Sequence, residues 1–386
     1  MKILFVIASF RNGGTNTSLR NMVSMLPKNN LQLYVFAVTD EGPNKDFLSQ
    51  YCTLLNPSGA SSSSINTKSN VISHFAHYVK WVKKKLEKVG VDISPLVFKR
   101  VASGLQKQNF DLVVAFQEET ATRFCSYFDK TRKIAWTRCD YSRYLSSPKI
   151  INLSRKIYTG FERIVCVSDY TCEQFLSVLP ELKSKSTSLH NLINDSLIIS
   201  RSKEKVTLPW NDKVFSIVSV GRFDKVKRFE YIPIIAKNLK DRGVHFKWAI
   251  IGGGNESINE NVNKALSDYN VKDEVILLGE INNPYPFIAN SNLLVCLSST
   301  EACPNVVNEA KILHVPVVAT NFGSVYEFLE DGYNGLITPI EQLGETIANV
   351  IVDNEKYNTL KNNIDSFKYD NEEIIGRLEK DIFKTE

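Results

Sequence analysis

Short runs of β-branched and other apolar residues alternate with longer stretches of helical period along the chain. Strand and helix in repeated alternation is typical of a parallel sheet with helices on its faces. In the first half the pattern predicts strands at 2–8, 32–39, 111–116, 133–137, 163–167 and 187–190. In the second half it predicts strands at 214–220, 245–251, 274–278, 293–297, 315–319 and 335–337. The fold class is therefore α/β, with two doubly wound, Rossmann-like domains.

The polar stretch 191–212 lacks a clear period and contains a proline, which predicts a linker. We therefore place an N-terminal domain at 1–200 and a C-terminal domain at 201–370. Residues 371–386 end the chain with apolar residues at helical spacing. We expect them to form a C-terminal helix that packs back on the N-terminal domain.

The opening run MKILFVIAS contains about seven apolar residues, too few for a secretory core, and predicts a first buried strand. No stretch approaches the roughly 18 apolar residues that span a bilayer. Seven cysteines, odd in number and without a C-x-x-C pair, indicate reduced thiols and a cytoplasmic location. The five histidines are scattered and no Asp-x-Asp occurs, so we expect neither a metal site nor a metal cofactor.

The net charge of +5 conceals a difference between the two halves of the chain. Residues 1–200 carry 26 Lys and Arg against 15 Asp and Glu, whereas residues 201–386 carry 21 against 27. A basic first half indicates an anionic partner, either nucleic acid, acidic phospholipid or a phosphate-bearing substrate. The lysine-rich segment 78–88 is more typical of a solvated surface helix, with contact to a membrane surface as the alternative.

The most informative motif is SSTEACPNVVNEAK, which directly follows the apolar strand NLLVCL. Pro304 fits the first turn of a helix. The next three backbone N–H groups, of Asn305, Val306 and Val307, are expected to point unpaired into the crevice at the carboxyl end of the strand. This arrangement predicts a seat for phosphate.

Two carboxylates, Glu301 and Glu309, flank the predicted seat. Carboxylates are poor phosphate ligands, so we expect them to accept hydrogen bonds from hydroxyl groups of a sugar or ribose. A nucleotide sugar offers both phosphate and hydroxyls. In isolation, a glutamate near a helix start would only favour the helix dipole.

Positive charge follows another predicted strand, VFSIVSV, which runs into Gly221 and Arg222, with Lys227 shortly after. The planar fork of Arg222 and the point charge of Lys227 suit a diphosphate leaving group. A lone Gly-Arg pair after a strand would be weak evidence, and a surface turn would be the better interpretation of it.

Together these residues resemble the retaining glycosyltransferases of the GT-B fold, in the large group numbered family four. The resemblance covers nearly the whole chain and is firmest from about 214 to 340. The family's Glu-x7-Glu motif stands here as Glu301 to Glu309, with its Pro-Asn at 304–305. The resemblance implies that Glu301 meets hydroxyls of the donor sugar, that Glu309 meets the ribose, and that Arg222 and Lys227 hold the diphosphate. It makes Arg222, Lys227 and Glu301 the candidate catalytic residues.

Several glycines extend the resemblance. Gly13 and Gly14 match paired glycines before a helix, and 252–254 looks like the family's glycine turn. The donor-binding residues implied by the resemblance, beside Glu309, are Gly14, Gly221, Gly253, Asn305 and Val306.

The chain also departs from the family pattern. Ala302 and Cys303 stand where a glycine and an aromatic residue are usual, so the donor-sugar pocket is expected to differ in shape. Arg138 stands where histidine is frequent, so a histidine general base is not supported. Glu118, Arg138 and Asp140 are candidates for the acceptor side, with simple solvation as the alternative.

The resemblance implies two domains facing a central cleft and a front-face transfer with retention. The implied donor is a nucleotide diphosphate sugar, with a UDP-sugar favoured, carrying a hexose or an N-acetylhexosamine. The implied acceptor is a saccharide or a lipid-linked one, in bacterial surface polysaccharide synthesis such as capsule or lipopolysaccharide. The protein is then cytoplasmic, with peripheral contact to the inner face of the cell membrane through its basic half.

Three other classes compete with this interpretation. A sugar-nucleotide epimerase shares the fold but requires more acid and base groups. A dinucleotide-dependent oxidoreductase requires G-x-G-x-x-G after a strand, which IIGGGNE does not fit. A noncatalytic module that binds nucleic acid or another ligand leaves Arg222 and the two glutamates without a role, and the basic half lacks interleaved aromatics for stacking.

Overall fold

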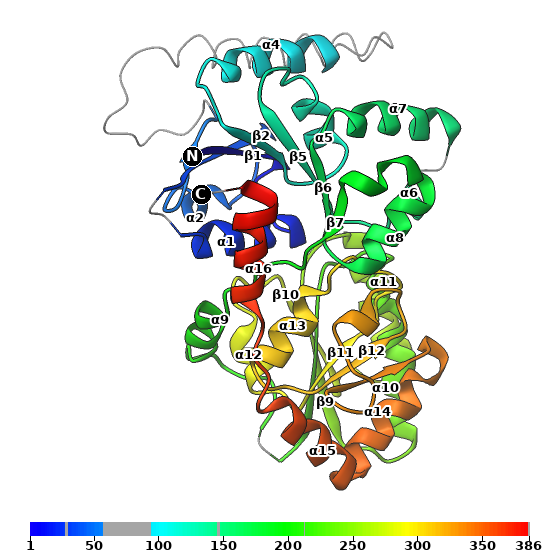
Figure 1. Cartoon of the computed structure of the whole chain (residues 1–386). Helices are drawn as coiled ribbons and strands as arrows, with labels where there is room; N and C mark the ends of the chain where they lie inside the picture. Colours follow the sequence, from blue (N-terminus) through cyan, green and yellow to red (C-terminus); the bar gives the residue numbers. More distant parts are fainter. Residues whose placement is uncertain (28–29, 57–93, 145–146, 212, 385–386) are drawn as a thin grey trace. The chain divides into compact units, whose positions relative to one another are not determined.

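The computed structural model describes residues 1–27, 30–56, 94–144, 147–211 and 213–384 (Figure 1). The chain divides into two compact units, and each is described by itself. The first unit contains 1–167, 171–192 and the chain from Glu372 on, and the second contains 168–170 and 193–371. The lysine-rich segment 78–88 lies outside the described residues.

The first unit is built on a seven-stranded parallel sheet, in the order β3-β2-β1-β4-β5-β6-β7. Its strands are β1 (Lys2–Ser9), β2 (Gln32–Thr39), β3 (Thr53–Leu54), β4 (Leu112–Ala115), β5 (Arg132–Thr137), β6 (Arg163–Cys166) and β7 (Ser186–Ser188). The six predicted strands are confirmed to within two residues at each end. Sequence reasoning missed β3, because two residues are too few to show a period.

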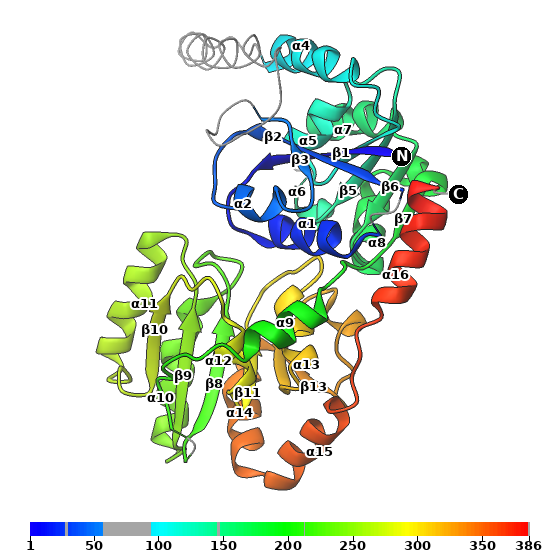
Figure 2. The same ribbon diagram turned by 90° about the vertical axis from the view of Figure 1, so that its left-hand side faces the viewer.

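Helices cover both faces of this sheet, with α4 and α5 on one side and α1 on the other (Figure 2). The helices are α1 (Gly14–Met25), α2 (Lys45–Leu48), α4 (Ser94–Gln106), α5 (Thr120–Cys125), α6 (Tyr141–Tyr144), α7 (Pro148–Thr159) and α8 (Asp169–Val178), followed by the 3-10 helix η1 (Pro180–Lys185). The opening run is the interior strand β1, which lies between β2 and β4 and whose residues 3–7 are fully buried. Burial on both faces explains why that strand is apolar without alternation.

The end of the chain belongs to the first unit. It forms α16 (Asn371–Arg377) and the π-helix η5 (Leu378–Phe383). The ring of Phe383 is fully buried and lies 6.4 Å from that of Phe5 in β1. The guanidinium of Arg377 donates to the carbonyl of Ser188 at 2.7 Å. The C-terminal segment therefore completes the core of the first unit.

The second unit is built on a six-stranded parallel sheet, in the order β10-β9-β8-β11-β12-β13. Its strands are β8 (Phe215–Val220), β9 (Phe246–Ile251), β10 (Val275–Gly279), β11 (Leu293–Cys296), β12 (Val317–Thr320) and β13 (Gly335–Thr338), and all six confirm the prediction within two residues. Successive residues of β8 enter separate cores, Ile217 on one face and Val218 on the other. The strand order reverses next to β8, between β8 and β11, which is where such sheets bind ligands.

The helices of the second unit are α9 (Asp195–Ser202), α10 (Ile232–Asp241), α11 (Glu256–Asp268), α12 (Tyr285–Ala289), α13 (Asn305–Ile312), α14 (Leu343–Val352) and α15 (Asn354–Ile364), with short 3-10 turns η2 (Phe229–Tyr231), η3 (Val325–Glu327) and η4 (Ile340–Gln342). Helix α9 corrects the prediction of an irregular linker at 191–212. Asn194 caps it by accepting the N–H of Leu197 at 3.0 Å, and Ile198 packs with Ile193 and Ile312. A helix of eight residues shows too few turns for its period to stand out from a polar stretch.

Candidate functional site

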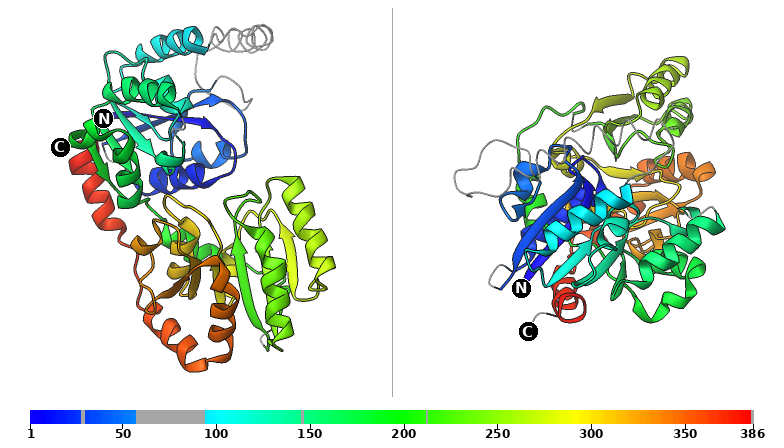
Figure 3. Two further views of the ribbon diagram at one scale, coloured as in Figure 1. Left: turned by 90° about the vertical axis from the view of Figure 1, so that its right-hand side faces the viewer. Right: turned by 90° about the horizontal axis from the view of Figure 1, so that it is seen from above.

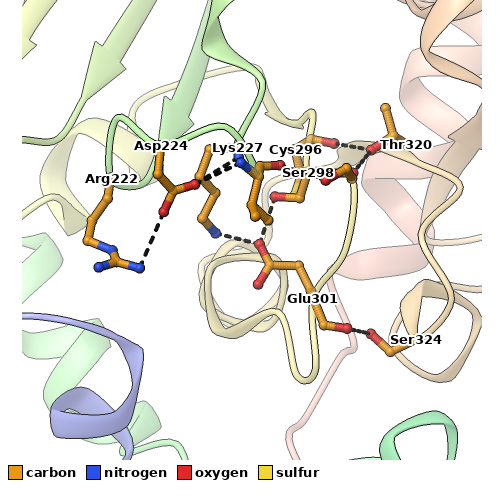
Figure 4. Close-up of polar contacts among 10 residues, drawn as sticks. Arg222, Asp224, Lys227, Cys296, Ser298, Glu301, Thr320 and Ser324 are labelled. Atoms are coloured by element: carbon orange, nitrogen blue, oxygen red, sulfur yellow. Dashed lines mark hydrogen bonds and ion pairs between the residues drawn. The ribbon is translucent and has the colours of Figure 1, made fainter. Parts of the chain in front are cut away.

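Lys227 and Glu301 form an ion pair at the carboxyl edge of the second sheet, where their side chains are 21% and 17% exposed (Figure 4). The ammonium donates to Oε1 of Glu301, and the hydroxyl of Ser298 donates to the same oxygen at 2.7 Å. Burial opposes the charge on Lys227, but the attraction of Glu301 contributes to a net rise in the pKa of the lysine. Oε2 of Glu301 accepts no hydrogen bond from the described residues and is the oxygen available to a ligand.

The loop after β8 brings Lys227 to this position. Oδ1 of Asp224 accepts the N–H groups of Val226 at 3.0 Å and Lys227 at 3.1 Å, which turns the chain back. A Cβ on Gly221 would lie 3.2 Å from Cδ of Lys227. A Cβ on Gly252 would lie 1.7 Å from the carbonyl oxygen of Gly221, so that position requires glycine. The glycines let the lysine stem and the neighbouring strand approach the loop closely.

Hydroxyl groups hold the loop that carries Glu301. Ser324 donates to the carbonyl of Glu301 at 2.8 Å, and Thr320 donates to the carbonyl of Ser298 at 2.5 Å (Figure 4). Sequence reasoning missed these supporting hydroxyls. The available signal was position, because Thr320 ends β12, the strand next to β11, at the same carboxyl edge.

Glu309 lies on α13 and is 8% exposed. Burial raises the pKa of its carboxyl to about 7, and the positive charge of Lys227 acts in the opposite direction. Among the described residues, none forms a hydrogen bond or an ion pair with this carboxylate. The structure thus brings Glu309, Glu301 and Lys227 into one electrostatic group.

The start of α13 differs from the prediction. Pro304 precedes the helix as its cap residue instead of occupying the first turn. The N–H of Val307 donates to the carbonyl of Pro304 at 3.0 Å, so the prediction of an unpaired amide is wrong for Val307. The predicted phosphate seat then depends on the amides of Asn305 and Val306. The helix begins one residue later, and its first internal hydrogen bond uses the Val307 amide.

Two further predicted residues lie at the same edge without contacting the ion pair. The side chain of Arg222 is 67% exposed, and its Nη2 lies 3.3 Å from Oδ2 of Asp224. A Cβ on Gly253 would lie 2.9 Å from Oε2 of Glu280. Arg222 is therefore an exposed cation that pairs with Asp224, while Gly253 makes room for a neighbouring carboxylate.

In the first unit, Glu118 and Arg138 lie together. The N–H of Arg138 donates to Oε2 of Glu118 at 3.2 Å. Its guanidinium donates to the carbonyl of Phe116 at 2.8 Å and to Oδ1 of Asn191 at 2.7 Å, and stacks 3.9 Å from the ring centre of Phe116. Arg138 is thus held by its own unit.

Asp140 and Gly14, the other predicted residues of the first unit, follow strands β5 and β1 at the carboxyl edge of its sheet. Asp140 is 7% exposed, accepts from Ser142 at 2.6 Å and pairs with Arg143 at 3.2 Å, so it is not a solvated loop residue. Gly14 begins α1, and a Cβ added there would meet no atom within 4 Å. Packing does not require glycine at that position.

The remaining predictions concern metals, thiols and membranes. The part of the chain that the structure describes contains no group of three or more His, Cys, Asp or Glu arranged to hold a metal ion. The seven cysteines are free thiols. None of the described helices has both the length and the apolar character needed to cross a bilayer.

Comparison with known proteins places these observations in a family context. Residues 200–367 match the family model of glycosyl transferases group 1. An uncharacterised glycosyltransferase of Methanocaldococcus jannaschii is 26% identical over 201 residues, which cover 50% of this chain and 49% of that protein. LpsE, a lipopolysaccharide core biosynthesis glycosyltransferase of Rhizobium meliloti, is 28% identical over 169 residues, covering 43% of this chain and 47% of LpsE. The chain thus spans about half the length of these curated relatives.

Among solved structures, HepE of Anabaena in complex with UDP and glucose aligns over 100% of both chains, with a TM-score of 0.78 and 17% identity. The chain therefore has the GT-B fold of two parallel-sheet, Rossmann-like domains. The family match itself is confined to residues 200–367, within the second half of the chain.

Proposed function

We propose that the protein is a retaining glycosyltransferase of family four. It transfers a hexose or an N-acetylhexosamine from a nucleotide diphosphate sugar to a saccharide or lipid-linked acceptor in bacterial surface polysaccharide synthesis. The observation that carries the proposal is the ion pair of Lys227 and Glu301 beside the buried carboxyl of Glu309, at the edge where the strand order reverses. In this proposal the second unit binds the donor and the first unit binds the acceptor.

Each charged group has a role that its surroundings support. Lys227 and Arg222 neutralise the diphosphate that leaves, with the amides of Asn305 and Val306 as further donors. Oε2 of Glu301 accepts a hydrogen bond from a hydroxyl of the donor sugar, because Oε1 already accepts hydrogen bonds from Lys227 and Ser298. The carboxylate of Glu309 accepts hydrogen bonds from the ribose hydroxyls. A carboxylate that is buried without a hydrogen-bond donor gains most when a ligand supplies one.

The proposed reaction is a front-face displacement. The bond from the anomeric carbon to the phosphate oxygen breaks, and a bond to the acceptor oxygen forms on the same face. The acceptor hydroxyl gives its proton to the departing diphosphate. The side chains supply positioning and charge stabilisation, so the proposal includes no metal cofactor, and an excess of EDTA should leave the transfer rate unchanged.

A UDP-sugar is the favoured donor because HepE, which shares the fold, is described in complex with UDP and glucose. Surface polysaccharide synthesis is favoured because LpsE acts in lipopolysaccharide core biosynthesis. The test is a panel of nucleotide sugars screened for transfer, with the anomeric configuration of the product read by NMR. Inversion at the anomeric carbon, or no transfer from any donor, would contradict the proposal.

Two variants separate donor binding from turnover. Glu309→Ala should weaken binding of the UDP-sugar, because the ribose loses its acceptor. Arg222→Ala should lower kcat more than it changes donor binding, because the exposed cation is needed most when charge develops on the leaving group. Unchanged transfer rates in both variants would remove the assignment of this edge as the donor site.

The proposal also includes a cytoplasmic location with peripheral contact to an anionic membrane. The exposed side chains of helix α7 support this contact, and Figure 3 draws the backbone of this helix in green. Its Ile150 and Leu153 are 41% and 51% exposed, and the exposed Lys149 and Lys156 lie on the same side of the helix. The helix contains no acidic residue. Apolar side chains between lysines fit the interface of an anionic bilayer.

Vesicle flotation tests this contact. Vesicles with anionic lipid should bind the protein in low salt and release it in high salt. Replacing Lys149 and Lys156 together with glutamate should abolish that binding, whereas the same double change at the exposed Lys130 and Lys183 of the first unit should not. Equal binding to neutral vesicles, or no binding by the unaltered protein, would contradict peripheral contact and leave the transferase assignment intact.

A further inference from the structure

Lys311 is a buried lysine on the helix that carries Glu309, and the proposed chemistry does not use it. The residue is 5% exposed. Its ammonium donates to the carbonyl of Phe328 at 2.5 Å and lies 4.2 Å from the ring centre of Phe367. No carboxylate among the described residues forms an ion pair with it. The ammonium thus has one carbonyl and one aromatic face as its partners.

A charge in such surroundings is costly. A buried ammonium without a counter-ion loses hydration that a single carbonyl does not replace. Burial accordingly lowers the pKa of Lys311 to about 8. Methionine has a similar shape and would fill the same space without that penalty. The ammonium therefore has to contribute something that an apolar side chain does not.

The contact partner of Lys311 belongs to a segment that also reaches the donor site. Residues 324–328 follow β12 and include η3. At one end, the fully buried Ser324 donates to the carbonyl of Glu301 at 2.8 Å. At the other end, the carbonyl of Phe328 accepts from Lys311 on α13. The segment is thus fastened at one point to the loop of Glu301 and at the other to the helix of Glu309.

We propose that Lys311 is a positioning residue of the donor site. Its ammonium fixes segment 324–328 against α13 and thereby sets the position of Glu301 relative to Glu309. This inference rests on the proposed function, in which the two carboxylates contact different parts of one donor. Lys311 acts through Ser324 and the main chain of Glu301 and makes no contact with the substrate.

The test is Lys311→Met, compared with Lys311→Arg and with Lys237→Met as the matched control. Lys237 is a partly exposed lysine of the same unit, paired with Asp241 on α10. In Lys311→Met, kcat for sugar transfer should fall roughly tenfold to a hundredfold, because small displacements of a reacting group have effects of that size. UDP lacks the sugar that Glu301 contacts in the proposed function. The Kd for UDP should therefore change less than about twofold, which is well below the tenfold change in Kd that corresponds to about 1.4 kcal/mol.

Two further readings distinguish positioning from a general structural role. The melting temperature of Lys311→Met should equal or exceed that of the unaltered protein, because a costly buried charge has been removed. Lys311→Arg should restore part of kcat, since guanidinium can donate to the same carbonyl.

Several outcomes would overturn the inference. An unchanged kcat in Lys311→Met would show that the contact between Lys311 and Phe328 does not set the position of Glu301. A lower melting temperature with parallel losses in kcat and UDP affinity would show a role in folding only. If the unaltered protein transfers no sugar, the proposed function fails and the inference fails with it, and this result is obtained before any variant is made.

Discussion

The carboxyl edges of the two parallel sheets carry charged residues of different construction. In the second unit, Lys227 and Glu301 come from loops after two neighbouring strands and pair with each other. In the first unit, Arg138 donates to a main-chain carbonyl and an asparagine, and Asp140 pairs with Arg143 three residues away. At the second edge, charged side chains from different loops pair with each other. At the first edge, each charged side chain contacts groups other than a charge from a neighbouring loop.

The comparison teaches that a shared topology does not make equivalent sites. Parallel sheets direct loops from every strand to one edge, but the chemistry depends on which loops meet there. At the second edge, a buried carboxyl at Glu309 has the electrostatic influence of Lys227 and no hydrogen-bond donor among the described residues. The proposed function assigns the ribose hydroxyls of the donor to this carboxyl. At the first edge, Glu118 already receives an amide hydrogen bond from Arg138.

We expect a change in the core of the first unit to weaken that unit without altering the second. Phe383 is fully buried against β1, and Phe383→Ala should cost about 3–5 kcal/mol of the unfolding free energy of the first unit. Hydrogen exchange should report this loss in β1 and β4 and leave β8 and β11 protected. Binding of UDP should persist. Loss of protection in both sheets together would mean that the two units unfold as one.

The largest effect on chemistry is expected at Lys227. In the proposed reaction, Lys227→Met removes the charge next to the leaving diphosphate and also leaves Glu301 without its cation, so kcat/KM should fall about a hundredfold to a thousandfold. Lys225→Met is the matched control, because Lys225 is exposed in the same loop. Steady-state kinetics with a UDP-sugar checks both. A similar loss in the two variants would point to general electrostatic attraction in place of a specific contact.

Donor binding should depend on pH through Glu309. Its carboxyl has a pKa of about 7 when buried, so it is neutral below that pH and accepts ribose hydroxyls less well. The Kd for UDP should rise up to about tenfold per pH unit below 7. Titrations from pH 5 to 8 measure this slope, which Glu309→Gln should flatten.

Glu309 should also make stability depend on pH, with a definite sign. The pKa of its carboxyl is raised on folding, so the folded state keeps a proton that the unfolded chain releases. Its stabilising contribution is complete below about pH 4.5 and is lost as pH rises through about 7. Glu309→Gln should therefore raise the melting temperature relative to the unaltered protein more at pH 8 than at pH 5. The opposite order would contradict the buried, unpaired carboxyl.

The smallest effects are expected at the first edge. Arg138→Lys removes the fork that spans Phe116 and Asn191, and should raise KM for the acceptor a few-fold while the Kd for UDP stays unchanged. Asp140→Asn keeps the shape and should have a weaker effect. Acceptor titrations at saturating donor check both. A change in donor affinity would show that this edge also contributes to the donor site.

The sequence predicted the fold well, because buried parallel strands are apolar runs with clear ends. All six strands of the second unit appear where their β-branched runs predicted them. The short helix α9 and the two-residue strand β3 were missed, because neither is long enough to establish a period. The local pattern therefore sufficed to predict the fold, but it did not predict the short elements.

The site was predictable only in part. The residue types Lys227, Glu301 and Glu309 stood out in sequence, but the pairing of Lys227 with Glu301 joins loops that are 74 residues apart. The supporting contact from Ser324 depends on how neighbouring strands align, which sequence does not state. The Val307 amide was misjudged because the exact first residue of a helix decides which amides remain free.

The most direct test is a crystal structure of the protein with an intact UDP-sugar. The account predicts the diphosphate at Lys227 and the start of α13, the ribose hydroxyls at Glu309, and a sugar hydroxyl within hydrogen-bond distance of Oε2 of Glu301. A nucleotide bound elsewhere, or one whose sugar lies away from Glu301, would contradict the account.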